Sequence, residues 1–205
     1  IRVPGGKIAI ISAYAPQSMI SADQRFAFFT DSEVYYKSIS VNGIKLICGD
    51  FNARLRYQFP GEEAIMGTHF FQGIQKMPEI DSNRNFLMQL CNSIECILAN
   101  TFFAHDAEQL VTYFELAAKP MDTILPNRFA QLDYILCPGV SFEQIRDIQS
   151  NRLIALASHH FLLRCEFHDM IQVDKMSKKS LQRHIQWDYD ILRTDEGREA
   201  FTEQF

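Results

Sequence analysis

The sequence predicts a layered α/β or α+β fold, because segments with strand character and segments with helical character alternate along most of the chain. Short apolar and β-branched runs occur at residues 7–14, 44–48 and 131–137. Apolar side chains recur at helical spacing over residues 86–94. Of the 205 residues, 47% are hydrophobic, so the chain is long and apolar enough to form one domain with a substantial core.

Apolar runs and one capping motif predict the first three elements. A strand is expected at residues 7–14, which are apolar on both faces, as in the inner strand of a layered fold. A helix is expected over residues 22–39, because Ser21 and Gln24 have the S-x-x-Q spacing of a capping box. A second strand is expected at residues 44–48.

The middle of the chain is predicted to contain a long loop, a helix and two strands. Residues 54–80 include several prolines and glycines and have no sustained period, and long loops of this kind are often functional. Residues 82–94 have the clearest amphipathic pattern of the chain and are expected to be helical. Strands are expected at residues 96–103 and 111–116, before a proline-bearing loop at residues 119–128.

The end of the domain is predicted to consist of strands. They are expected at residues 131–137, 145–148 and 161–167, and alternate residues of the last one are apolar, as in a half-buried strand. We therefore expect one domain over residues 1–168. The composition changes after it, and residues 169–205 are expected to form a basic linker followed by a helix.

Charge and cysteine usage narrow the class of protein. The formal net charge of −5 argues against a basic, sequence-indifferent coat for nucleic acid, although an enzyme with an acidic metal site remains compatible. The five cysteines form no CxxC pair, which favours a reducing compartment, so we expect a nuclear or cytoplasmic location. No apolar run approaches the ~18 residues of a membrane span. The chain opens without Met directly before a strand-like segment, and we expect it to be a fragment.

The motif Gly49-Asp50-Phe51-Asn52 places a carboxylate and a carboxamide two residues apart at the end of an apolar strand. If the strand continues, Asp50 and Asn52 point to one side and Phe51 to the other. A carboxylate can bind a metal or position a water, and an amide can hold a reacting group without adding charge, as phosphoryl transfer requires. The same residues are typical of a polar turn, so the motif alone leaves both interpretations open.

Four places in the sequence put polar or ionisable groups at the end of an apolar strand: Tyr14, Asp50 with Asn52, Asp133, and His160. Strand ends on one rim of a sheet converge in space, so these groups are expected to meet. An unpaired carboxylate inside an apolar strand is costly, and Asp133 is expected to have a partner such as a histidine.

Less specific interpretations stay open for several of these residues. Tyr14 can simply end a strand with its hydroxyl in water, and either histidine of the pair His159 and His160 can be a surface residue. Histidines in loops, such as His105, are expected to have no catalytic role. Thr112 is expected to be structural.

Four motifs occur in an order that resembles the endonuclease/exonuclease/phosphatase superfamily, which includes apurinic/apyrimidinic endonucleases. They are Ser12-Ala13-Tyr14-Ala15-Pro16, Gly49-Asp50-Phe51-Asn52, Leu132-Asp133-Tyr134-Ile135-Leu136 and Ser158-His159-His160. In its finer details the sequence resembles the endonuclease domain of non-LTR retrotransposon polyproteins, and craniofacial-development-type proteins derived from them. The resemblance covers about residues 5–168, and four ordered motifs are more specific than any one of them.

The resemblance implies a four-layer sandwich of two β-sheets flanked by helices, acting on DNA with Mg²⁺ or Mn²⁺. It implies that Asp50 and Asn52 lie at the metal and the attacking water. Asp133 would pair with His160, which would face the scissile phosphate, and Tyr14 would contact the phosphate or help to place the leaving group. Residues 169–205 resemble the segment that leads to a reverse transcriptase, and we expect the chain to be a monomer.

The sequence departs from the family pattern in two ways. The family's N-terminal strands, which carry an early Asn and the Glu that is the main metal ligand, are expected to lie before Ile1. His159 stands where the family has an Asp near the metal, and an imidazole suits Zn²⁺ better than Mg²⁺. The favoured function by family is a metal-dependent endonuclease that nicks DNA, and this fragment alone is expected to be weakly active or inactive. The alternatives are a truncated, catalytically silent remnant that binds nucleic acid or protein, and a phosphatase acting on lipid or sugar phosphates.

Overall fold

The structure is a computed structural model, and it describes residues 2–3, 6–72, 82–154 and 157–168. The linker and helix expected at residues 169–205 lie outside the described residues. Among the helices that are described, none combines the length and the apolar character needed to cross a membrane. All five cysteines are free thiols.

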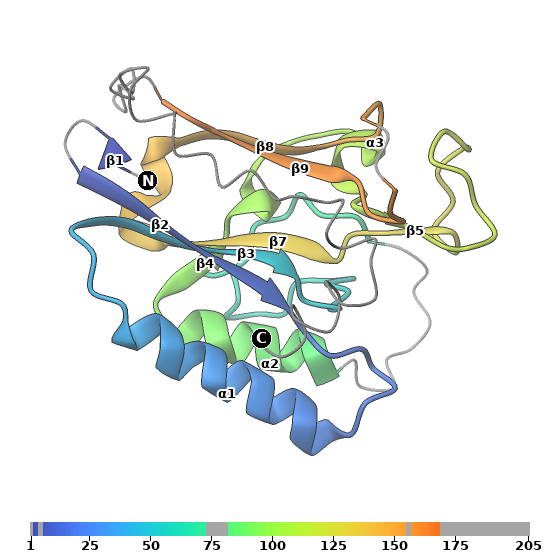
Figure 1. Ribbon diagram of the computed structural model, residues 1–205. Coiled ribbons are helices and arrows are strands. Elements are labelled where there is room, and N and C mark those ends of the chain that lie inside the picture. Colours follow the sequence, from blue (N-terminus) through green and yellow to red (C-terminus); the bar gives the residue numbers. More distant parts are fainter. Residues whose placement is uncertain (1, 4–5, 73–81, 155–156, 169–205) are drawn as a thin grey trace, which may run out of the picture. The chain divides into compact units, whose positions relative to one another are not determined.

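A mixed five-stranded sheet forms the centre of the domain (Figure 1). The order of its strands is β1 (Arg2–Val3), β2 (Gly6–Tyr14), β3 (Gly43–Asp50), β7 (Asp133–Pro138) and β4 (Cys96–Leu98). Strands β2 and β3 are parallel and are joined through the helix α1 (Ala22–Ser38), whereas β7 runs antiparallel to both β3 and β4. The expected strands at residues 7–14, 44–48 and 131–137 are therefore confirmed.

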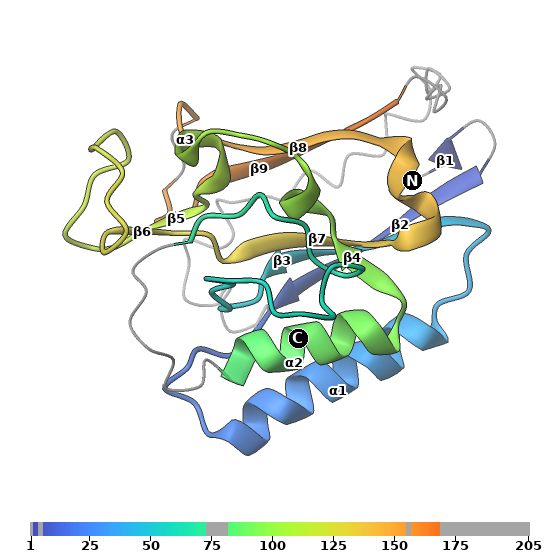
Figure 2. The same ribbon diagram turned by 180° about the vertical axis from the view of Figure 1, so that it is seen from behind.

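Different elements cover the two faces of this sheet (Figures 1 and 2). Helices α1 and α2 (Ser82–Ser93) lie on one face, where buried residues such as Ile47 and Leu136 pack in one cluster with Leu87 of α2. The antiparallel pair β8 (Ile145–Asn151) and β9 (Leu162–Phe167) lies on the other face. There Leu46 and Ile135 share a second cluster with Ile148 of β8.

The expected capping motif is present at the start of α1. The side-chain oxygen of Ser21 accepts a hydrogen bond from the backbone N–H of Gln24, and its hydroxyl donates to the side-chain oxygen of Gln24. The helix ends at Ser38, one residue before the expected end. Four apolar side chains of α2 are buried, as its periodicity predicts: Leu87, Met88, Leu90 and Cys91.

Shorter elements complete the domain. They are the 3₁₀ helices η1 (Ala99–Phe102) and η2 (Gly139–Gln144), the single-turn helix α3 (Ala107–Leu110), and the two-stranded sheet of β5 (Tyr113–Phe114) and β6 (Phe129–Ala130). The described part of the long loop, residues 54–72, contains no helix or extended strand, as expected.

Two expected strands are shorter than the sequence predicted. The strand expected at residues 96–103 ends at Leu98, because the side chain of Asn100 takes over the pairing with β7. The strand expected at residues 111–116 is reduced to Tyr113–Phe114. In both segments, side-chain hydrogen bonds or isolated bridges replace a regular ladder.

The expected burial of residues 7–14 on both faces is wrong for part of β2. Ile10 and Tyr14 are 54% and 66% exposed, because β8 and β9 cover Ile8 but leave the end of this face open. Within the described residues the layers are three: the two long helices, the five-stranded sheet and the β8–β9 pair. The fourth layer of the expected sandwich is not among them.

Candidate functional site

Three of the candidate side chains lie side by side across the end of the central sheet. Tyr14 of β2 is in register with Asp50 of β3, and Asp50 is directly opposite Asp133 of β7. Asp50 lies four residues after Leu46 and Asp133 two residues before Ile135, so both carboxylates point to the face that Leu46 and Ile135 turn to the β8–β9 pair. The sheet therefore presents the two carboxylates on one face, at the rim where β3 ends and β7 begins.

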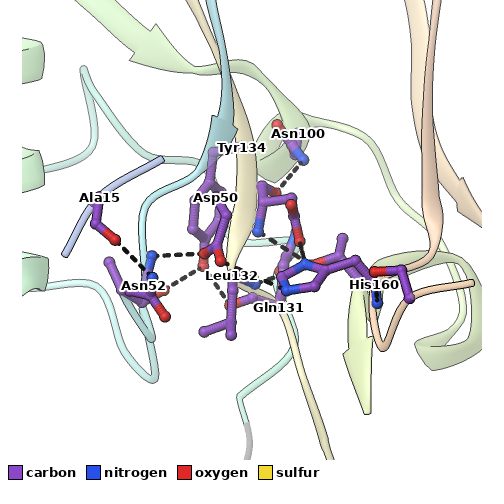
Figure 3. A network of polar contacts seen from close by, with 12 residues as sticks. Ala15, Asp50, Asn52, Asn100, Gln131, Leu132, Tyr134 and His160 are labelled. Atoms are coloured by element: carbon purple, nitrogen blue, oxygen red, sulfur yellow. Dashed lines mark hydrogen bonds and ion pairs between the residues drawn. The ribbon is translucent and has the colours of Figure 1, made fainter. Parts of the chain in front are cut away.

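His160 joins these carboxylates from the segment before β9. Residues 159–161 run beside residues 112–114, with hydrogen bonds from Phe161 N–H to Thr112 O at 2.8 Å and from Phe114 N–H to His159 O at 3.0 Å. The Nδ1 of His160 lies 2.9 Å from Oδ2 of Asp133, and its Nε2 lies 3.5 Å from Oδ2 of Asp50 (Figure 3). The histidine partner expected for Asp133 is therefore present.

The segment after β3 is both a turn and part of this polar group. Asn52 has a positive φ of 47°, and its backbone N–H donates to Oδ1 of Asp50 at 2.8 Å (Figure 3). Its side-chain amide donates to the carbonyl of Ala15 at 2.7 Å, so it connects the ends of β2 and β3. Because β3 ends at Asp50, strand alternation does not extend to Asn52, although Phe51 is fully buried in the core as expected.

Gly49 allows the two parallel strands to approach each other at this point. A Cβ at its position would lie 1.8 Å from the carbonyl oxygen of Ala13. A larger residue would therefore move Asp50 away from β2, which gives the glycine of the motif a physical role.

The sequence did not single out Asn100, although it holds the strand that carries Asp133. Asn100 is 2% exposed, and its side-chain amide donates to Asp133 O at 3.2 Å (Figure 3). Its side-chain oxygen accepts from Ile135 N–H at 2.8 Å. A buried Asn in the apolar run around it was the available signal, because such a group needs hydrogen-bond partners. Thr112, expected to be structural, accepts through Oγ1 from the N–H groups of Leu132 and Asp133.

Two neighbouring residues of α2 hold the segment that follows Asp50. The amide of Asn83 donates to the carbonyls of Pro16, Phe51 and Asn52. Arg84 donates to the carbonyls of Leu55 and Tyr57 and pairs with Glu62, and it is only 4% exposed. Nothing in the local pattern of an amphipathic helix distinguishes these contacts from exposed polar positions.

Burial and neighbouring charges shift the pKa values of Asp50 and His160. Burial raises the pKa of Asp50 above its ordinary 3.8; the N–H of Asn52 opposes this, Asp133 adds to it, and His160 opposes it. The hydrogen bond to Asp133 raises the pKa of His160 above 6.5, burial opposes this, and the charges of Asp133 and Asp50 add to it. The arrangement therefore favours a protonated imidazole between two carboxylates.

A cavity of about 530 Å³ opens at this rim. Its lining residues come from the ends of β2, β3 and β5 and from the segments around them: Tyr14, Gln17, Ser18, Met19, Arg25, Asp50, Asn52, Arg54, Arg56, Tyr113, Glu115, Leu132 and His160. His159 is not among them; its ring is exposed and packs edge-on against Phe114 at 5.0 Å. Four of the five expected catalytic residues thus line one cavity. The fifth, Asp133, does not line it and contacts the ring of His160 instead, and His159 lies outside.

The oxygen donors of this cavity suit a hard divalent cation. The carboxylate of Asp50 and the free amide oxygen of Asn52 are the kinds of ligand that Mg²⁺ and Mn²⁺ prefer, with substrate oxygens and waters in the other positions. No three His, Cys, Asp or Glu side chains within the described ranges converge as a complete metal site. Any cation held here would therefore depend on ligands beyond these side chains.

The sequence and the structure were compared with known proteins, and only the structure has similar ones. No protein-family model matches the sequence, and no curated protein is similar to it. The catalytic domain of Xenopus laevis APE2 is similar in structure, with a TM-score of 0.54 and 16% identity, over 78% of this chain and 50% of that one. An AP endonuclease from Archaeoglobus fulgidus is similar with a TM-score of 0.51 and 15% identity, over 78% of this chain and 62% of that one.

A third similar structure is the 3′-5′ exonuclease NExo from Neisseria meningitidis, with a TM-score of 0.50 and 16% identity, over 77% of this chain and 60% of that one. All three belong to the endonuclease/exonuclease/phosphatase superfamily. The chain has the fold of that superfamily. It spans between half and about three-fifths of the length of these structures. At these identities the similarity concerns the fold, and the chemistry is argued from the site itself.

Proposed function

We propose that this chain is a metal-dependent phosphodiesterase that nicks DNA, an endonuclease of the non-LTR retrotransposon type. The observation that carries the proposal is the array of Asp133, His160 and Asp50 at a cavity that Tyr14 and Asn52 also line. Two further observations support it. Similar structures are AP endonucleases and NExo, which has also been solved as a 3′ phosphatase with a product DNA hairpin. The four ordered motifs resemble the endonuclease/exonuclease/phosphatase superfamily, and finer features of the sequence resemble the retrotransposon type.

Each residue has a distinct part in hydrolysis. Asp50 accepts a proton from a water that attacks phosphorus, and a new P–O bond forms as the bond to the leaving oxygen breaks. The protonated His160 donates a hydrogen bond from Nε2 to a phosphate oxygen, and Asp133 fixes its orientation through Nδ1. Tyr14 contacts the phosphate or helps to place the leaving group. A Mg²⁺ or Mn²⁺ held by Asp50 and Asn52 would polarise the phosphate and neutralise developing charge.

The second candidate is a catalytically silent module that binds nucleic acid or protein. The small number of metal ligands favours this second candidate. Among the described residues, Asp50 and Asn52 are the only expected metal ligands that line the cavity. Loss of a metal ligand costs orders of magnitude in rate. A silent module would retain binding and lack turnover, so one assay separates the two candidates.

The test is nicking of supercoiled plasmid by the whole chain with Mg²⁺ or Mn²⁺. We expect nicking that EDTA abolishes and that Asp50→Asn lowers about 10³-fold, because the residue both binds metal and accepts a proton. Asp31→Asn, at an exposed carboxylate on α1, is the matched control and should leave the rate unchanged. Binding without turnover in the wild type would favour the silent module. Faster release of phosphate from phosphoinositides than nicking of DNA would favour a phosphatase.

A further inference from the structure

Arg25 has an unusual environment in the first turns of α1. It is half-buried, and its Nε is buried without a hydrogen-bond partner. A guanidinium carries five N–H donors and is always charged, so a buried donor without an acceptor costs free energy unless a ligand supplies one. The side chain lines the cavity that also contains Asp50, Asn52 and His160.

The two buried arginines among the described residues, Arg84 and Arg152, use their donors within the fold. Arg84 binds two backbone carbonyls and the carboxylate of Glu62. Arg152, which is 9% exposed, donates to the carbonyls of Pro120 and Asp122. Arg25 makes no such bond with any residue in the described part of the chain. The fold therefore does not explain why an arginine occupies this position.

The cavity concentrates positive charge in a chain whose net charge is −5. Three arginines line it, Arg25 from α1 and both Arg54 and Arg56 from the segment after β3, against the two carboxylates of Asp50 and Glu115. Arg54 pairs with Glu115 at 3.2 Å, and Arg25 lines the same cavity as Asp50 and His160. An anionic ligand beyond the scissile group would gain from this excess.

We propose that Arg25, together with Arg54 and Arg56, forms a subsite for a non-scissile phosphate of the nucleic-acid backbone, next to the reacting phosphate at Asp50 and His160. The proposal rests on the proposed function, since it assigns the substrate position that this cavity holds. Guanidinium groups bind phosphate through paired N–H donors, which the terminal nitrogens of Arg25 supply. Arg25 is then a positioning residue that binds substrate rather than a group that takes part in bond breaking.

Equilibrium binding of a labelled DNA duplex in Ca²⁺, measured over a series of salt concentrations, tests the subsite without requiring turnover. Each phosphate contact contributes about 0.9 to the slope of log K against log [salt]. Arg25→Gln is expected to reduce the magnitude of that slope by about 0.9, the contribution of one phosphate contact, and to weaken DNA binding about tenfold. Arg25→Lys should reduce both the slope and the affinity by less. Arg146→Gln, at an exposed arginine of β8 that is not among the residues lining this cavity, is the matched control.

The site of the missing contact is tested with a single uncharged methylphosphonate placed at each position flanking the mapped nick. A methylphosphonate at one internal position should weaken DNA binding by the wild type and leave DNA binding by Arg25→Gln unchanged. Sensitivity only to a terminal phosphate, or an unchanged salt slope in Arg25→Gln, would overturn the subsite, as would a wild-type chain that does not bind DNA. Binding with the expected slope change but without nicking would count against the proposed function and in favour of the subsite.

Stability separates this role from a structural one. Arg25→Gln should melt at the wild-type temperature or slightly above it, because the substitution removes a buried donor that has no partner. In the nicking assay it should raise KM and leave kcat nearly unchanged. A melting temperature lowered as far as in Arg84→Gln would mean that Arg25 holds the fold, and would contradict the proposal.

Discussion

Two histidine–aspartate pairs occur in the described part of this domain, and their surroundings differ. His160 lies 2.9 Å from Asp133, and His105 lies 2.7 Å from Asp147. The first pair adjoins a second carboxylate and an open cavity of about 530 Å³. In the second pair the amide of Gln149 donates to the other oxygen of Asp147, and His105 is not among the residues that line this cavity. A histidine–aspartate pair therefore becomes a candidate for catalysis only where the free ring nitrogen faces a cavity with further charged groups.

Replacement of the two histidines should affect different properties. His160→Gln is expected to lower the nicking rate about 10²–10⁴-fold, because it removes the hydrogen-bond donor aimed at the phosphate. His105→Gln should leave the rate within about twofold and cost about 1–2 kcal/mol of stability, because one buried hydrogen bond is lost. Single-turnover nicking and urea denaturation of both variants measure the two effects. Equal rate losses would remove the distinction between the pairs.

Replacement of the two aspartates should repeat this contrast at a smaller scale. Asp133→Asn is expected to lower the nicking rate about 100-fold, since the imidazole stays but loses the carboxylate that orients it and favours its proton. Asp147→Asn should have no effect on rate. Nicking assays at several pH values check this, and an Asp133→Asn protein with wild-type rates would show that His160 needs no orientation.

The support behind the first pair is expected to matter for stability as well as activity. Asn100→Ala removes both side-chain hydrogen bonds to β7 and leaves Ile135 N–H and Asp133 O buried without them. We expect a loss of about 2–3 kcal/mol in the free energy of unfolding, together with a measurable loss of nicking in the protein that remains folded. Urea denaturation monitored by circular dichroism measures the first effect. Unchanged stability would mean that β4 and β7 pair without this residue.

The smallest expected effect is a dependence of stability on pH in the metal-free protein. The pKa of His160 is raised in the folded state, so its contribution is complete below its ordinary 6.5 and is lost as pH rises through the folded value. The raised pKa of Asp50 acts in the same direction at lower pH. The free energy of unfolding in EDTA should therefore fall as pH rises above 6.5, less steeply in Asp133→Asn. A steeper fall in that variant would contradict the assigned cause.

The polar residues at the rim of the central sheet could be predicted because they depend on short stretches of neighbouring sequence. The apolar run before Asp50 fixes where β3 ends, and the apolar run after Asp133 fixes where β7 begins. A carboxylate inside an apolar strand requires a partner. The sequence also predicted the cap at Ser21 and the buried face of α2 from spacing alone. Each of these depends on a few neighbouring residues, which a sequence displays directly.

The features that the sequence did not reveal depend on contacts between distant segments. The early end of β4 follows from the side chain of Asn100, which replaces a backbone partner of β7 more than thirty positions away. The open face at Ile10 depends on how far β8 and β9 extend over β2. Arg25 looked like an ordinary polar helix position, and only the cavity beside it gives it a candidate role.

The central claim is that Asp50 and His160 act on one phosphate as one unit, and a double-mutant comparison tests it most directly. We propose to measure single-turnover nicking at saturating Mg²⁺ for the wild type, Asp50→Asn, His160→Gln and the double variant. We predict large losses in both single variants and a double variant about as slow as the slower of them, because groups in one unit are not additive. Near-wild-type nicking by either single variant, or fully multiplicative losses in the double variant, would contradict the claim.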